Sequence, residues 1–140
     1  MPFKGLPEFT AALERLKVGA DVAGFEATKE GAALIEDRTK KAVLAQSHGK
    51  GTPTPSAPGQ PPATITGNLA RSVTTQGPVR VGFGAYEARV GPTTVYGRVQ
   101  ELGGGRSNLP PRPYLGPTVI ALRGELFATY ERAWAGALSL

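Results

Sequence analysis

The sequence contains no cysteine and only one histidine, His48. Without cysteine, the chain can form neither disulfides nor thiolate metal sites. His48 stands beside a glycine, and no Asp, Glu or Cys lies near it at the spacing of a metal site. The sequence also has no Ser-His-acid arrangement with local support and no glycine-rich phosphate-binding motif. These absences predict a protein that is not an enzyme and has no metal site, cofactor or catalytic residues.

Long hydrophobic runs are missing as well. No apolar stretch approaches the roughly 18 residues that a membrane-spanning helix needs. The N-terminal residues MPFKGLPEFTAALERL lack the apolar centre of a signal peptide. We therefore expect a soluble protein that is made in the cytoplasm and has no contact with a membrane.

Glycine and proline are abundant, with 19 and 13 of the 140 residues. Both exceed their average usage in globular proteins. The length fits a single domain over residues 1–140, and a hydrophobic content of 40% allows one modest core. The glycine and proline content predicts long irregular segments around a small folded centre.

The positive charge is concentrated in the middle of the chain. The net charge is +5, and residues 67–113 hold six arginines against two glutamates. Two interpretations remain open: a solvated basic sheet edge that resists unwanted strand pairing, or a surface for phosphates in a DNA-binding accessory protein. The arginines are Arg71, Arg80, Arg89, Arg98, Arg106 and Arg112.

Helical patterns fill residues 7–46. Apolar residues at helical spacing predict a first helix over 7–17 and a longer one over 20–46, with Gly19 ending or bending the first. Gly24 and Gly31 lie seven residues apart on one face, which favours a close contact with another helix there. The longer helix exceeds the size of a small domain, so we expect one of its ends to reach past its own core.

Residues 47–66 cannot form a regular element, because their prolines and glycines remove amide donors and fix extended backbone angles. Two interpretations remain open: a surface loop, or an arm that becomes ordered against a neighbouring subunit. The candidate arm residues are Pro53, Pro55, Pro58, Pro61 and Pro62.

Residues 69–91 alternate between apolar and polar side chains, which predicts strands. Segments 70–76, 79–84 and 85–91 are expected to form an antiparallel meander with its apolar face under the helices. On that face we expect Val79, Val81 and Phe83 from one strand, and Tyr86, Ala88 and Val90 from the next.

The last part of the chain holds two further helices. Residues 94–102 have helical spacing and end at three consecutive glycines. A proline-rich segment then leads into a C-terminal helix over 116–138. Its apolar face is predicted to contain Val119, Leu122, Leu126, Tyr130, Ala133 and Ala137, widened by Phe127 and Trp134. The predicted fold class is α+β, with a small antiparallel sheet, a long N-proximal helix, a C-terminal helix and a long Pro/Gly-rich loop.

Four short motifs occur in a fixed order between residues 56 and 120. Together they resemble the neck or tail-completion (head–tail connector) proteins of long-tailed bacteriophages. The first is TG-x-L-x-x-S-V and the second is VGP; the third is YG-x-x-x-E-x-G and the fourth is RPYL-x-P. The matching residues are Thr66, Gly67, Leu69, Ser72 and Val73; Val90, Gly91 and Pro92; Tyr96, Gly97, Glu101 and Gly103; and Arg112, Pro113, Tyr114, Leu115 and Pro117.

The resemblance implies a structural virion protein at the phage head–tail junction, made in the host cytoplasm. It implies assembly as a homo-oligomeric ring around the connector that joins head to tail. The partners would be other neck and tail proteins, namely the head-closure protein, the adaptor on the portal side or the tail terminator, with possible weak contact with packaged DNA.

The candidate interface lies in and beside the third and fourth motifs. We expect Arg112, held between prolines, to meet a carboxylate, with Glu101 as its partner in the chain or across a subunit boundary. A second interpretation, compatible with the first, is that RPYL docks the final helix with Tyr114 and Leu115 in the core. The candidate interface residues are Tyr96, Glu101, Arg106, Arg112, Pro113 and Tyr114.

Overall fold

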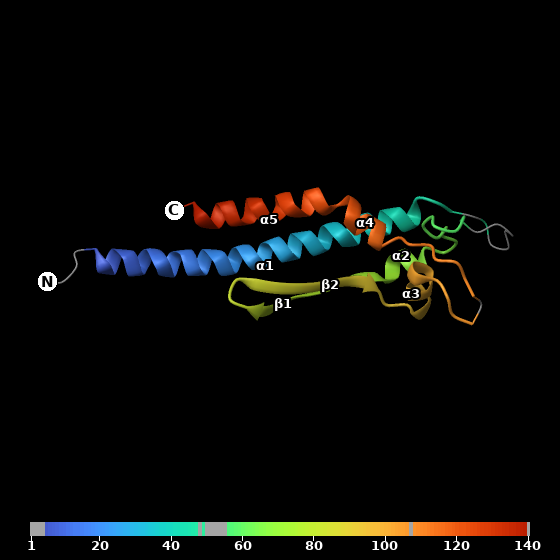
Figure 1. Cartoon of the computed structure of the whole chain (residues 1–140), viewed down its shortest axis with the longest axis horizontal. Coiled ribbons are helices and arrows are strands. Elements are labelled where there is room, and N and C mark those ends of the chain that lie inside the picture. The colour runs from blue at the N-terminus through green and yellow to red at the C-terminus, as the bar shows by residue number, and fades with distance from the viewer. Residues whose placement is uncertain (1–4, 48, 50–55, 107, 140) are drawn as a thin grey trace.

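A computed structural model describes residues 5–47, 49, 56–106 and 108–139. It confirms the α+β class: a long N-terminal helix lies between a C-terminal helix and a two-stranded antiparallel hairpin (Figure 1). The elements are α1 (Leu6–Leu44), α2 (Asn68–Ser72), β1 (Val73–Gly82), β2 (Ala85–Pro92), α3 (Val95–Leu102), α4 (Gly116–Ala121) and α5 (Arg123–Leu138).

Helix α1 is continuous, so the predicted break at Gly19 is wrong. At about 1.5 Å per residue, its 39 residues span nearly 60 Å. Gly19 serves a different purpose, because the end of α5 passes close to it. A Cβ atom at Gly19 would lie 3.2 Å from the carbonyl oxygen of Ala137. The N-terminal end of α1 projects beyond both α5 and the hairpin (Figure 1). This end belongs to the predicted first helix, 7–17, and not to the longer one, 20–46, that was expected to extend past the core.

Gly24 and Gly31 both mark close approaches, but the predicted contact with another helix is found only at Gly31. A Cβ atom at Gly24 would lie 2.2 Å from the carbonyl oxygen of Gly84, in the hairpin turn. At Gly31 it would lie 3.4 Å from Leu126 of α5. Small residues in α1 therefore let both neighbouring elements pack closely against it.

The sheet has two strands rather than the three-segment meander predicted. The predicted strands 70–76 and 79–84 form one strand, β1, and the start of the first belongs to α2. The ladder is irregular between Gln76 and Val79 and then resumes with the pair Val79–Glu87. The Gly77-Pro78 sequence, which separated the two predicted segments, therefore lies at a bulge in a single strand.

The hairpin packs on α1 with one face. Tyr86 donates its hydroxyl to Asp21 Oδ2 at 3.0 Å, and its ring meets Phe25 edge-on at a centroid distance of 5.6 Å. The predicted inward face of β1 is wrong, because Val79, Val81 and Phe83 are 61%, 62% and 58% exposed. Since the sheet has only two strands and one covering helix, its other face remains open.

The large buried side chains gather at one end of the molecule. Val43 from the end of α1 meets Leu69, Val73 and Tyr114, with Val90 packed against the group. Along the rest of α1 the buried residues are small, mainly alanine and glycine. The apolar core therefore lies where α1 ends and α2 and β1 begin.

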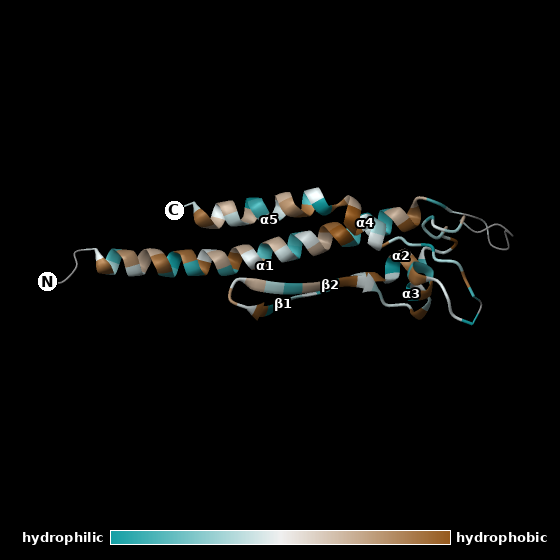
Figure 2. Ribbon diagram, viewed as in Figure 1, coloured by the Kyte–Doolittle hydropathy of each residue, from teal (hydrophilic) through white to brown (hydrophobic). Residues whose placement is uncertain are grey.

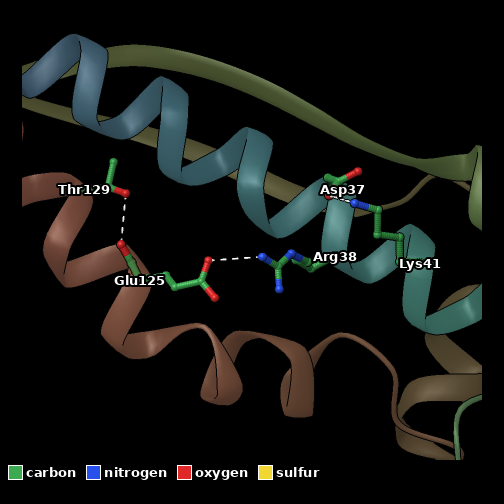
Figure 3. A network of polar contacts seen from close by, with 5 residues as sticks. All are labelled: Asp37, Arg38, Lys41, Glu125 and Thr129. Carbon is green, nitrogen blue, oxygen red and sulfur yellow. Dashed lines mark hydrogen bonds and ion pairs between the residues drawn. The ribbon is translucent and has the colours of Figure 1, made fainter.

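The C-terminal segment consists of two helices that meet at Leu122, which is buried. Phe127 was expected on the buried face but is exposed. Arg38 of α1 reaches across to Glu125 of α5, with 3.2 Å between Nη2 and Oε2 (Figure 3). Both side chains are about half exposed, so this pair adds little stability. The close packing of small residues therefore holds α5 on α1.

Replacing Gly24 with alanine tests the contact between α1 and the hairpin turn. Alanine raises helix propensity by up to about 1 kcal/mol, but its Cβ atom would collide with backbone at Gly84. We expect Gly24→Ala to lower the free energy of unfolding by about 1–3 kcal/mol, measured by denaturant titration. The control is Gly124→Ala, where a Cβ atom meets nothing within 4 Å. Equal stability of the two variants would contradict the close approach.

Candidate functional site

The four ordered motifs come together in one cluster around the core. The first motif forms α2 and its flanks: Gly67 has a φ of +71°, and Leu69 and Val73 are buried. Ser72 donates its hydroxyl to the carbonyl oxygen of Leu69 at 2.7 Å. The same hydroxyl lies 3.3 Å from that of Thr94, just before the third motif. The first motif is thus bonded to the segment that follows the second. We call the residues of the four motifs the motif cluster.

The second and third motifs touch at Gly97. Pro92 of the second motif pairs with Val73 in the ladder. A Cβ atom at Gly97 would lie 2.6 Å from the Pro92 side chain and 3.1 Å from the Tyr114 hydroxyl. That hydroxyl donates to the carbonyl oxygen of Gly97 at 3.1 Å. Glycine is therefore the residue that lets α3, β2 and the fourth motif meet.

Glu101 joins the third motif to the fourth. Its Oε2 accepts hydrogen bonds from the backbone N–H groups of Tyr114 and Leu115, at 2.8 and 2.9 Å. Its Oε1 accepts from the N–H group of Gly116, the first residue of α4, at 2.8 Å. The first amides of a helix have no partner within the helix, and a carboxylate satisfies them well. Glu101 therefore caps the C-terminal helical segment from outside it.

The predicted pairing of Arg112 with Glu101 within the chain is wrong. Arg112 donates from Nε to the carbonyl oxygen of Ser56 at 2.9 Å, and its side chain is buried at 8% exposure. Its backbone N–H group bonds the carbonyl oxygen of Gln100 at 2.7 Å. Three backbone amides bind the Glu101 carboxylate. Arg112 instead joins the segment at Ser56 to α3, through its side chain and its backbone N–H group.

Tyr114 fills the centre of the motif cluster and is 1% exposed. Burial, together with the neighbouring Glu101 and Tyr96, raises the pKa of Tyr114 to about 12. Its hydroxyl therefore stays neutral and acts as a hydrogen-bond donor. Tyr114 is buried and Leu115 packs against the core, which confirms that RPYL docks the final helical segment.

The described part of the proline-rich loop is bonded to its own subunit. Gly59 donates to the carbonyl oxygen of Pro111 at 3.0 Å, and Thr64 donates to that of Gln46 at 2.8 Å. Among the candidate arm residues, Pro62 is buried, Pro61 is half-buried and Pro58 is exposed. Residues 56–64 are thus fixed within the chain, which leaves little of them free to act as an arm. Pro53, Pro55 and His48 lie outside the described residues.

The exposed part of the motif cluster is the outer side of α3. Val95 is 89% exposed, and Tyr96 and Leu102 are also exposed. Of the other candidate interface residues, Arg106 is exposed and Pro113 is half-buried. Helical spacing placed Val95, Val99 and Leu102 on one stripe. Val99 is half-buried, and the pattern did not reveal that Val95 and Leu102 are exposed. Apolar surface of this kind is typical of a partner contact.

Four of the six central arginines have partners within the chain. Arg80 pairs with Asp21, and Arg89 pairs with Glu87, at 3.2 and 2.8 Å. Arg71 donates to the carbonyl oxygen of Thr66, and Arg112 is buried. Since four of the six are engaged within the chain, the charge count alone overstates the surface available to phosphates.

Neither a search for metal-binding groups and membrane helices nor comparison with known proteins assigns a function to this chain. Within the described ranges, no three His, Cys, Asp or Glu side chains are placed to hold a metal ion. None of the helices described is long and apolar enough to span a membrane. In comparison with known proteins, the chain matches no protein-family model, no curated protein and no solved structure.

Variants of Glu101 test its capping role. Glu101→Ala removes the acceptors of three amides, and we expect it to lower the free energy of unfolding by about 2–3 kcal/mol. Glu101→Gln keeps one oxygen acceptor, so its effect should be smaller. The control is Glu87→Ala, which breaks an exposed ion pair and should cost less than about 1 kcal/mol. Chemical denaturation of the three variants distinguishes capping from a surface charge effect. A surface charge effect would lower the free energy of unfolding equally in all three.

Proposed function

We propose that this chain is a structural virion protein of the head–tail junction of a long-tailed bacteriophage. One observation supports this most directly. The four motifs that resemble neck and tail-completion proteins are separated in the sequence, yet they meet through specific contacts around Tyr114. A chance resemblance gives no reason for them to share one structural unit. The role is non-enzymatic: the protein positions surfaces for assembly.

The shape and surface of the chain suit an assembling subunit. Its accessible surface is 9387 Å², whereas a compact monomer of 14.6 kDa has about 6,900 Å². Much of the difference comes from an elongated body with exposed hydrophobic side chains at both ends. Permanent subunit interfaces are large and apolar. The excess surface therefore supports burial against partners in the virion.

In this proposal the subunits form a ring around the connector, and the outer side of α3 meets the neighbouring protein. A ring interface is heterologous, so the two surfaces that meet on each copy differ. Val95, Tyr96 and Leu102 supply one apolar surface that is firmly positioned, because Gly97 and Glu101 hold α3 from its other side. The partner surface lies on a second copy or on an adjacent neck protein.

An early stop codon in this gene of the parent phage tests the proposed role. We expect electron microscopy of the lysate to show filled heads separate from tails, or tails with defective upper ends. Supplying the intact protein in trans should restore joined particles. Normal, infectious particles in the stop-codon lysate would contradict the proposal.

The same complementation tests the α3 surface. Val95→Glu changes a side chain that is almost fully exposed, so the protein should fold normally but restore at least tenfold fewer infectious particles, since every 1.4 kcal/mol lost at an interface weakens it about tenfold. The matched control is Ile120→Glu, an exposed apolar residue on α4. If both variants complement fully, α3 is not the assembly surface. The head–tail role is then tested only by the lysate of the stop-codon phage.

A further inference from the structure

The N-terminal part of α1 carries an apolar face that the rest of the chain leaves uncovered. The face follows alternating steps of three and four residues, the heptad pattern of helices that pack side by side. Its C-terminal part is buried under α5 and the hairpin, from Ala20 onward. Its N-terminal part is exposed, although its residues are larger. The face consists of Leu6, Phe9, Leu13, Leu16, Ala20, Ala23 and Ala27.

The covering elements end before the apolar face does. The end of α5 passes Gly19, and the hairpin turn passes Gly24. In the part of the chain that the structure describes, no element lies over residues 6–12, and Leu6, Phe9 and Leu13 are 58%, 60% and 48% exposed. Figure 2 shows hydrophobic residues along this projecting part of α1. From Gly19 to Leu6 the apolar face thus continues for about 20 Å past the elements that cover it.

A groove lies where the covering elements end. Its volume is about 460 Å³, and its apolar lining consists of Leu13, Leu16 and Ala20 of α1 together with Phe83, Trp134 and Leu138. The charged side chains of Glu14 and Lys17 also border it. These residues come from the helix, the hairpin turn and the end of α5. The groove is therefore open toward the projecting segment, and it fits large apolar side chains.

We propose that two copies of this chain pair through these segments, with the projecting helices antiparallel. Leu6 and Phe9 of each copy then seat in the groove of the other. The antiparallel direction follows from sterics: a partner helix running parallel would meet α5 and the hairpin, which occupy this face from Gly19 onward. An antiparallel partner leads its own body away from them. The contact is isologous, so one arrangement covers both apolar segments and both grooves.

The exposed surface of the whole chain is large enough to include an interface with a second copy. The chain exposes about 2,500 Å² more than a compact monomer of its mass. A standard interface buries roughly 800 Å² on each partner. The pairing rests on residues 6–20 and the groove alone, so it holds or fails independently of the head–tail role.

Sedimentation velocity of the purified full chain over the micromolar range tests the pairing. We expect a dimer that dissociates on dilution. Phe9→Glu should weaken it by tenfold or more, since a charge would enter an apolar groove. Phe9 is exposed in the single chain, so the variant should keep its far-ultraviolet circular dichroism. The matched control is Phe127→Glu, an exposed phenylalanine on α5 away from the groove, which should dimerise normally.

Single cysteines test the direction of the helices, because the natural chain has none. Leu13 lies near the middle of the overlap, so Leu13→Cys should form a disulfide-linked dimer under mild oxidation. Leu6→Cys should not, because antiparallel helices place the two Leu6 positions about 20 Å apart. A monomer at all concentrations would overturn the pairing, as would normal dimerisation of Phe9→Glu. Efficient cross-linking of Leu6→Cys would overturn the antiparallel direction.

Discussion

The Glu101 carboxylate holds three consecutive backbone amides, and the position of the C-terminal helices depends on it. Residues 114–116 connect the core to α4, so their orientation sets the direction of the chain that follows. The position of Glu101 is itself fixed, because Gly97 on the same helix lets α3 lie against Pro92 and Tyr114. A short polar contact between two motifs thereby determines where a helix of 16 residues, α5, approaches α1. Its energy comes from satisfying helix N–H groups that would otherwise have no partner.

The distribution of side-chain size along α1 explains why the molecule is stable at one end and open at the other. Large apolar residues surround Val43, where α1, α2 and β1 converge. Toward the N-terminus the buried residues become alanine and glycine, which allow close approach but bury little apolar area each. On the N-terminal side of Ala20 the apolar residues are large again, yet α5 and the hairpin do not extend far enough to cover them. Large side chains without an intrachain partner are typical of surfaces that become buried in an assembly.

The sequence predicted the positions of the helices and strands better than the contacts between them. Helical and alternating periodicity located α1, β2, α3 and the C-terminal segment. The spacing of Gly24 and Gly31 predicted a contact with another helix, which is correct for Gly31, whereas Gly24 meets the hairpin turn. Periodicity did not resolve Gly19, since a glycine can end a helix or admit a neighbour, and only the approach of α5 decides. The opposite charges of Arg112 and Glu101 likewise suggested an ion pair, although a carboxylate can bind backbone amides equally well. The errors therefore concern long-range contacts, which local patterns do not contain.

The exposed apolar faces of β1 and α1 also show that a local pattern does not determine which element covers a face. Alternation at Val79 and Val81, and the heptad spacing of Leu6, Phe9 and Leu13, both indicate faces that need a cover. Within one chain neither receives it, because a two-stranded hairpin and one short helix cannot surround a helix of nearly 60 Å. The two proposed contacts also lie at opposite ends of the molecule, with α3 near the end of α1 and the groove near its start (Figure 1). Pairing through the projecting helices would therefore leave α3 accessible, and a protein joined at one end could still bind a partner at the other.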